Sequence, residues 1–192
     1  MLKKYIPDVN NPYDYKKTAH LLRRCITGVT HSEIIYSVEK GLDSTVDELF
    51  SNYSQSTDYI SEWAGKDCQN VRPPDDNDYF VWFWEHYRRV QMFYQWWLMN
   101  IRDSKFSIQE RLVLFWHNHF ASDIRLNVQF ASFMYTHYRM LQNNSIGNFR
   151  DFVRATSRDL CIQLNLSQHF NYVHYDKKYI NENYARELLE LH

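Results

Sequence analysis

Apolar residues recur at intervals of three and four positions over most of this chain, the spacing that places them on one face of a helix. The longest pattern extends from about Asp78 to Arg102 and predicts the main core helix. The apolar face of this helix is broad, which indicates burial against more than one neighbour. Its predicted members are mostly aromatic: Tyr79, Phe83, Tyr87, Val90, Tyr94 and Trp97.

Start and stop signals divide the N-terminal region into short helices. The first is expected to begin near Asp14 and to end before Gly28. Thr30–Glu33 is a capping-box pattern, in which the threonine side chain accepts a backbone N–H and the glutamate bonds back to the cap. The helix that it opens is expected to end at Gly41, because glycine readily takes the C-cap conformation. Ser44–Asp47 predicts the start of a third helix.

The C-terminal half also reads as helices. Ser107–Glu110 is a further capping-box pattern and predicts the start of a helix that reaches Phe120. The remaining helices are expected at residues 124–142, at residues 148–166 and from about Asn181 onward, with a histidine- and tyrosine-bearing loop over residues 167–178. No helix-ending residue follows Leu191 and His192, so the chain is expected to be truncated within its last helix.

Composition supports an all-α fold. The 192 residues include 12 Phe, 15 Tyr and 6 Trp but only 4 Gly and 4 Pro, and few breakers with many large side chains suit packed helices. We predict an irregular orthogonal helical bundle of about seven to nine helices. One helical domain is expected over residues 1–192, with an arm at 1–13, a loop-rich part at 54–78 and the core at 79–192.

Charge and cysteine usage exclude several classes of protein. With 22 basic and 23 acidic residues the formal net charge is -1, so no basic field is available for nucleic acid. Cys25, Cys68 and Cys161 form no CxxC pair and indicate neither a disulfide framework nor a structural zinc site. The N-terminus lacks the apolar core of a secretory signal, and the charge-free aromatic run Val90–Ile101 is too short to span a bilayer.

The helix that starts at Ser107 carries two histidines, and a regular helix separates them. Ile108, Leu112, Phe115 and His119 then share a stripe, so His119 is expected to face the core. His117 points about 200° away. The pair could therefore bind one ion only if the helix unwinds at Asn118. The alternative is a hydrogen-bonded core histidine at 119 with a partly exposed histidine at 117.

The last helix carries a polar cluster. Its members share an arc of about 100° on the helical wheel: Asn183, Arg186, Glu187 and Glu190. One interpretation is a solvated face with an Arg186–Glu190 pair, worth tenths of a kcal/mol. The other is an inward-facing site that binds a metal together with histidines of another helix, or that orients a substrate.

Four motifs in this order and spacing resemble a known family. They are TAHLLRRCITGVTHSEI with GLDSTVDELF, QERLVLFWHNHFASD, GNFRDFVRATSRDLCIQLNLSQ and NENYARELLELH. The chain is similar to the amino-terminal portion of the bacterial domain-of-unknown-function 1800 proteins. The resemblance implies a longer protein, whose missing C-terminal part is an expected partner. Many members look exported, although this chain shows no signal, so its compartment stays open.

Two functions follow from these patterns. The first is an enzyme, with metal-assisted hydrolysis as the first reaction to test and a site between the FWHNHF helix and the last helix. The second is a non-catalytic scaffold or binding module, in which the same residues form a hydrogen-bond network and surface aromatics bind a partner or glycan. In the enzyme, the candidates are His117, Glu187 and Glu190 for catalysis, Asn183, Arg186 and Asn118 for a polar substrate, and His117 with His119 for a divalent metal.

Overall fold

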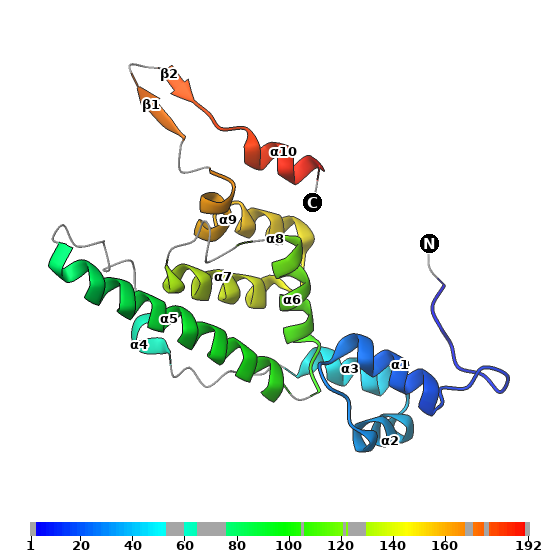
Figure 1. The fold of residues 1–192 in the computed structure, drawn as a ribbon. Helices are drawn as coiled ribbons and strands as arrows, with labels where there is room; N and C mark the ends of the chain where they lie inside the picture. The colour runs from blue at the N-terminus through cyan, green and yellow to red at the C-terminus, as the bar shows by residue number, and fades with distance from the viewer. Residues whose placement is uncertain are drawn as a thin grey trace. The chain divides into compact units, whose positions relative to one another are not determined.

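The computed structural model of the chain is helical, with one short β-hairpin (Figure 1). It describes residues 3–52, 60–64, 76–104, 106–120, 122, 130–167, 171–174 and 177–190. The helices are α1 (Tyr15–Cys25), α2 (His31–Lys40), α3 (Leu42–Ser51), α4 (Ser61–Ala64), α5 (Asp76–Asp103), α6 (Gln109–His119), α7 (Ala131–Asn144), α8 (Phe149–Thr156), α9 (Leu160–Asn165) and α10 (Asn183–Glu190). The strands are β1 (Tyr172–His174) and β2 (Lys177–Tyr179). The predicted all-α fold is confirmed.

The chain divides into two compact units, which are described separately. Unit 1 contains residues 1–55 and 100–111, and unit 2 contains residues 56–99 and 112–192. The prediction of one domain over the whole chain stays a prediction. Most of the loop-rich part predicted at 54–78 lies outside the described residues.

Unit 1 is built from α1, α2 and α3, and local capping explains two of their boundaries. The Asp14 side chain accepts from the backbone N–H of Lys17 at 2.9 Å and starts α1 where the sequence predicts it. Thr30 and Glu33 form both bonds of the predicted capping box. The helices close over an apolar core made of Ala19, Leu22, Ile26, Ile34, Leu49 and Phe106.

The predicted start of α3 is wrong by three residues. Gly41 has a φ of 86°, a conformation that favours glycine, and it is both the last cap of α2 and the first cap of α3. The helix therefore begins at Leu42 instead of after Ser44. Thr45, inside the expected capping box, donates its hydroxyl to the carbonyl oxygen of Gly41 at 2.7 Å.

Unit 2 is centred on α7, which contacts α4, α8 and α9. Trp96 of α5 and Tyr138 of α7 are both buried, and their rings meet edge to face with centroids 4.8 Å apart. Aromatic pairs in this arrangement add to the stabilisation from burial alone. The buried side of α7 carries Ala131, Met134, Tyr135, His137, Tyr138, Leu141 and Gln142.

The main core helix was predicted at the right place, but only part of its predicted face is buried. Helix α5 spans Asp76–Asp103, and its buried residues near the C-terminal end include Phe93, Trp96 and Trp97. Phe83 and Tyr87, which were expected in the core, are 44% and 50% exposed. Aromatic residues surround α5 on all sides, so periodicity alone could not select the arc that its neighbours cover.

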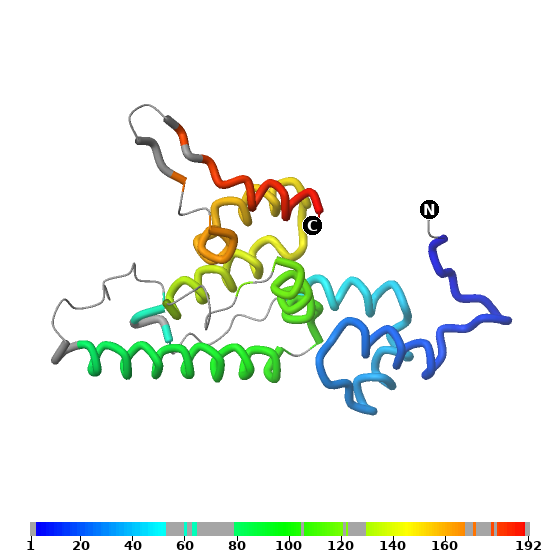
Figure 2. The backbone as a smooth tube through the Cα atoms, turned by 45° about the horizontal axis from the view of Figure 1, so that its top comes forward, coloured from blue at the N-terminus to red at the C-terminus, as the bar shows by residue number. Residues whose placement is uncertain are grey.

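Two further elements differ from the prediction near the C-terminal end. The single helix expected over residues 148–166 is divided into α8 and α9, because Asp159 caps a new helix through a bond from the N–H of Ile162. The loop expected over residues 167–178 contains an antiparallel hairpin, in which Tyr172 pairs with Tyr179. The hairpin lies between α9 and α10 along the chain (Figure 2).

Candidate functional site

The buried face of α6 is the opposite of the one predicted. Val113 is fully buried, whereas Phe115 is 55% exposed. His117 shares the side of Val113, since the two are four residues apart on one helix. Helical geometry predicted the relative directions of His117 and Phe115 correctly, but the stripe that contains Phe115 was wrongly assigned to the core.

The second histidine of α6 packs among neighbouring rings of its own segment. The His119 ring lies parallel to that of Phe115 with centroids 6.1 Å apart, and it meets Trp116 edge to face at 5.7 Å. Helix α6 continues through Asn118 to His119, so the unwinding that a shared ion on His117 and His119 requires is not seen. Asn118 itself is exposed, and its role in substrate binding stays a prediction.

His117 meets a second histidine that the sequence did not single out. Its Nδ1 lies 3.4 Å from Nε2 of His137 in α7. The other ring nitrogen of His137, Nδ1, lies 2.9 Å from Oδ1 of Asp159. The edge of the Trp97 ring contacts His117, with centroids 5.0 Å apart. Three elements of unit 2 thus bring His117, His137 and Asp159 into one chain of contacts.

Burial distinguishes the two ends of this chain. The side chains of His137 and Asp159 are 1% and 3% exposed, whereas His117 is half-buried. The Asp159 carboxylate also accepts the N–H of Ile162 at 3.1 Å, so the start of α9 fixes its position. His117 is therefore the member closest to solvent, and it is held by a rigid buried pair.

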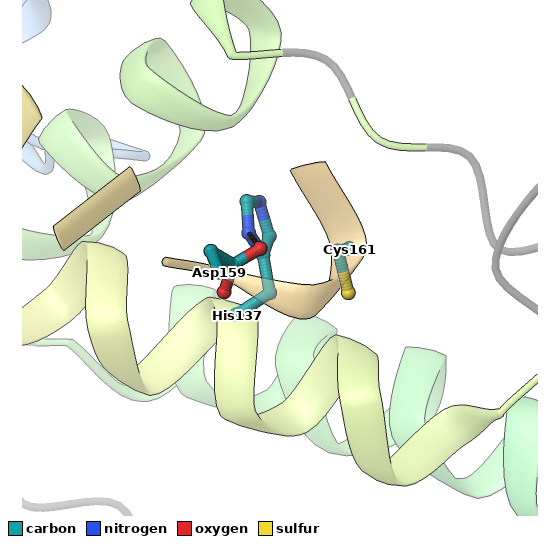
Figure 3. Close-up of side chains that lie close together, drawn as sticks. All are labelled: His137, Asp159 and Cys161. Atoms are coloured by element: carbon teal, nitrogen blue, oxygen red, sulfur yellow. Dashed lines mark hydrogen bonds and ion pairs between the residues drawn. The ribbon is translucent and has the colours of Figure 1, made fainter. Parts of the chain in front are cut away.

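Cys161 lies beside the same pair, at the start of α9 (Figure 3). The ligand atoms of His137, Asp159 and Cys161 are all within 4.8 Å of one another, and among the described residues this is the group whose spacing suits a metal ion. The thiol donates to Sδ of Met134 at 3.7 Å. Burial, followed by the negative charge of Asp159, raises the pKa of the Cys161 thiol above its ordinary value.

The polar side chains of the last helix contact one another, on a helix that has half-buried but no fully buried residues. Arg186 contacts Glu187 at 3.0 Å, Glu190 at 3.6 Å and Oδ1 of Asn183 at 2.5 Å. The Arg186 and Glu190 side chains are 50% and 60% exposed, and α10 has no buried residue. The Asn183 amide also donates to the carbonyl oxygen of Leu166 at 3.3 Å, which ties the start of α10 to the end of α9.

His137 and Asp159 were missed because each looks ordinary in the sequence. His137 lies within the helix predicted at residues 124–142, with no second metal ligand at a recognisable spacing. Asp159 was placed inside a continuous helix. The available signal was the position of Asp159 directly before the apolar residues that form α9. Aspartate is a preferred N-cap residue, and an N-cap carboxylate accepts a backbone N–H of the first turn, which holds its oxygens in place.

Fold and site together define an α-helical protein in which a buried histidine–aspartate pair supports a partly exposed histidine. The chain belongs to the family described as Protein of unknown function (DUF1800), whose model matches residues 20–192. This confirms the resemblance that the motifs predicted. No curated protein and no solved structure matches the chain. Within the described residues, no helix is long and apolar enough to cross a membrane.

Proposed function

We propose that this chain carries the site of a metal-assisted hydrolase, with the ion bound by Nδ1 of His117 and Nε2 of His137. The observation that carries the proposal is the 3.4 Å separation of these two nitrogens. Two imidazole nitrogens at about 2.05 Å from one tetrahedral ion lie about 3.3 Å apart. A hydrogen bond with a nitrogen donor is usually about 2.9 to 3.0 Å long, so the separation suits shared coordination better.

Asp159 supports the proposal from behind His137. A carboxylate that accepts from Nδ1–H leaves the lone pair of Nε2 directed at the ion, and most metal-binding histidines are oriented in this way. The 2.9 Å contact between Asp159 and Nδ1 of His137 has this geometry. The bond from Ile162 to the same carboxylate holds it in place. Asp159 is thus a positioning residue, and His137 is a ligand.

Because His117 is half-buried, an ion bound to it can be reached from solvent. A divalent ion bound there would supply Lewis acidity and a water of lowered pKa for attack on an ester or amide. Catalytic zinc usually has three protein ligands. Cys161 is not assigned as the third ligand, because its thiol donates to Met134.

The α10 cluster keeps the roles predicted for it. Asn183 and Arg186 are the candidates for orienting a polar or anionic substrate, and Glu187 and Glu190 for carboxylate chemistry. Their support is the set of contacts that gathers the amide, the guanidinium and two carboxylates on one arc of α10. These roles are tested separately from the ion, because variants of α10 leave the two histidines unchanged.

A non-catalytic scaffold is the second candidate. It is favoured by the burial of His137 and Asp159, because fully satisfied buried polar networks also fix the packing of helices. In this function the network stabilises unit 2 and binds no ion. The two candidates differ in metal content and in turnover.

The test is hydrolysis of p-nitrophenyl acetate and p-nitrophenyl phosphate by metal-free and zinc-loaded protein. We expect zinc-dependent turnover that His117→Ala lowers by about 100-fold, since it removes an ion ligand. His119→Ala, which removes a histidine two residues away, is the matched control and should retain turnover. No turnover in either form, together with no bound zinc, supports the scaffold. Turnover that is equal in metal-free and zinc-loaded protein contradicts metal-assisted hydrolysis.

A further inference from the structure

Helix α5 carries a second repeated pattern, on the side that faces away from the core of unit 2. Its buried residues near the C-terminal end include Phe93, Trp96 and Trp97. On the opposite side of the helical wheel, residues recur at alternating intervals of four and three: Phe80, Trp84, Tyr87, Gln91, Tyr94 and Leu98. We call this set the heptad stripe. Its spacing is that of the a and d positions of a coiled coil, which meet the same face of a partner helix.

The heptad stripe is exposed over most of its length. Phe80 is 67% exposed, Trp84 62%, Tyr87 50% and Leu98 64%. The ring of Trp84 meets the ring of Tyr87 edge to face with centroids 6.0 Å apart, and it meets the ring of Phe83 at 5.8 Å. The rings near the N-terminal end of the stripe therefore form a continuous aromatic surface. Helix α5 lies at one edge of unit 2, where this surface is accessible (Figure 2).

The exposed apolar area on this side of α5 is large. Aromatic side chains have about 150 to 250 Å² of surface each, so the exposed fractions of the stripe and of the neighbouring Phe83, which is 44% exposed, correspond to about 500 Å². The largest apolar patch of a typical monomer has about 300 to 600 Å² and is often functional. Two copies that cover each other would bury about 1,000 Å² from this patch alone, the area at which a specific interface begins. The patch is thus large enough to hold a second copy of the chain.

The order of side chains along the stripe suits an antiparallel pair. The N-terminal half holds three large aromatic residues, whereas two of the three residues of the C-terminal half are smaller. In an antiparallel pair centred between the third and fourth members, Phe80 faces Leu98 of the partner subunit and Trp84 faces Tyr94 of the partner subunit. Large side chains that face smaller ones interdigitate well. A parallel pair would instead place the bulky rings of Phe80 and Trp84 against their own copies.

Gln91 is the one strongly polar member of the stripe, and it is exposed. In the same antiparallel pair it faces Tyr87 of the partner subunit, whose hydroxyl can donate to the amide oxygen of Gln91. The amide therefore exchanges a bond to water for a bond across the interface, which avoids the cost of an unsatisfied buried group. A single polar residue at a core position of a coiled coil also fixes the register of the two helices.

We infer that α5 forms a homodimer interface, in which the heptad stripe of one copy packs antiparallel against the stripe of a second copy. The two copies are related by a two-fold axis, so one patch serves both subunits and the assembly closes at two chains. The inference is independent of the proposed hydrolase, because no residue of the stripe belongs to the network of His117, His137 and Asp159.

Sedimentation equilibrium at protein concentrations from about 1 to 100 µM tests the inference. We expect a species with twice the 23.5 kDa mass of the chain. Trp84→Ala should raise the dissociation constant of the dimer by at least about 30-fold, because it removes an aromatic anchor from the interface. Phe50→Ala is the matched control, since Phe50 is a 44% exposed aromatic residue of α3 outside the stripe, and its dissociation constant should be unchanged.

Circular dichroism of both variants checks that their helices are intact. An unaltered protein that stays monomeric up to about 100 µM would overturn the inference. Equal dissociation constants for Trp84→Ala and the unaltered protein, or equal losses in Trp84→Ala and Phe50→Ala, would overturn it as well, because the dimer would then use another surface.

Cysteine cross-linking tests the orientation of the two helices. Position 80 faces position 98 in the antiparallel pair, so mild oxidation should link Phe80→Cys to Leu98→Cys when the two variants are mixed. Each variant alone should give no more cross-linked dimer than the unaltered protein, which measures the contribution of the native cysteines. Equal cross-linking in each variant alone and in the mixture would contradict the antiparallel arrangement.

Discussion

Helices α6 and α10 carry the two strongest motifs of the chain, yet their polar side chains have different surroundings. His117 of α6 is attached to a buried pair whose members are 1% and 3% exposed. Arg186 of α10 is half exposed, and its bonded partners include Asn183, Glu187 and Glu190 of the same helix. The first set joins three elements of unit 2, whereas the second is gathered mainly within one helix.

Both clusters consist of polar side chains, but they differ in burial and therefore in how firmly their side chains are held. A charge pair on an exposed helix is screened and contributes about 0.3 to 0.5 kcal/mol. A buried polar pair is held by surrounding packing, and removing one member leaves the other without compensation. A site that must hold an ion within tenths of an ångström therefore fits the α6–α7–α9 network, while the α10 cluster is suited to contacts that adjust to a substrate.

Removing the buried histidine should have the largest effect on stability. His137→Ala should lower the free energy of unfolding by about 3 to 5 kcal/mol, because the Asp159 carboxylate stays buried without its partner. Urea unfolding followed by tryptophan fluorescence, with EDTA present, measures this without any contribution from metal. Arg186→Ala is the control from α10 and should change the same quantity by less than about 0.5 kcal/mol. Similar losses in both variants would remove the contrast between the two clusters.

A conservative change at the aspartate should affect ion binding more than stability. Asn at position 159 can still cap α9, but it weakens the negative charge behind His137. Asp159→Asn should therefore lower zinc affinity by about 10- to 100-fold, the usual effect of altering a residue behind a metal-binding histidine. Competition with a chromophoric chelator measures the affinity. Asp151→Asn, at an aspartate that forms an exposed pair with Arg154 in α8, should have no effect, and equal losses would show that Asp159 does not act through His137.

The smallest expected effect comes from an exposed cluster of the α10 type. Hydrogen bonds from Arg88 and then Arg89 lower the pKa of Glu85 in α5 to about 2. The unfolded chain takes up this proton near pH 4.5, so the stabilisation is complete above that pH and is lost as the pH falls towards 2. Because the Glu85 side chain is 38% exposed, solvent screening should limit the contribution to less than about 1 kcal/mol.

Glu85→Gln measures this contribution directly. The difference in unfolding free energy between the unaltered protein and the variant should be present at pH 6 and should shrink at pH 3. If Glu85→Gln lowers the free energy of unfolding as much as His137→Ala does, exposed helix clusters and buried networks contribute equally to stability in this protein. A difference that grows at low pH would contradict the assigned direction of the pKa shift.

Local patterns in the sequence predicted much of the fold. The Asp14 cap, the Thr30–Glu33 capping box and the position of α5 all depend on neighbouring residues, and all three are found. The buried face of α6 was assigned wrongly, and that of α5 was assigned correctly only in part, since Trp97 is buried but Phe83 and Tyr87 are exposed. Which arc is covered depends on helices distant in the sequence, and aromatic residues all around α5 leave no single apolar stripe.

The candidate site was predicted in part for the same reason. His117 was identified from its motif, and the helical geometry correctly directed it away from His119. The contact between His117 and His137 joins residues 20 positions apart in the sequence. The contact between His137 and Asp159 depends on the start of α9, where a continuous helix was predicted. Long-range pairing of single side chains leaves no periodic trace in one sequence.

Cobalt(II) titration, followed by the visible absorption of the bound ion, tests the central claim most directly. The unaltered protein, His117→Ala, His137→Gln and His119→Ala should be compared at one pH. We predict one bound ion in the unaltered protein and in His119→Ala, and loss of the absorption in His117→Ala and His137→Gln, because these two histidines supply the nitrogens 3.4 Å apart. Equal cobalt binding in all four proteins, or its loss in His119→Ala alone, would contradict the account.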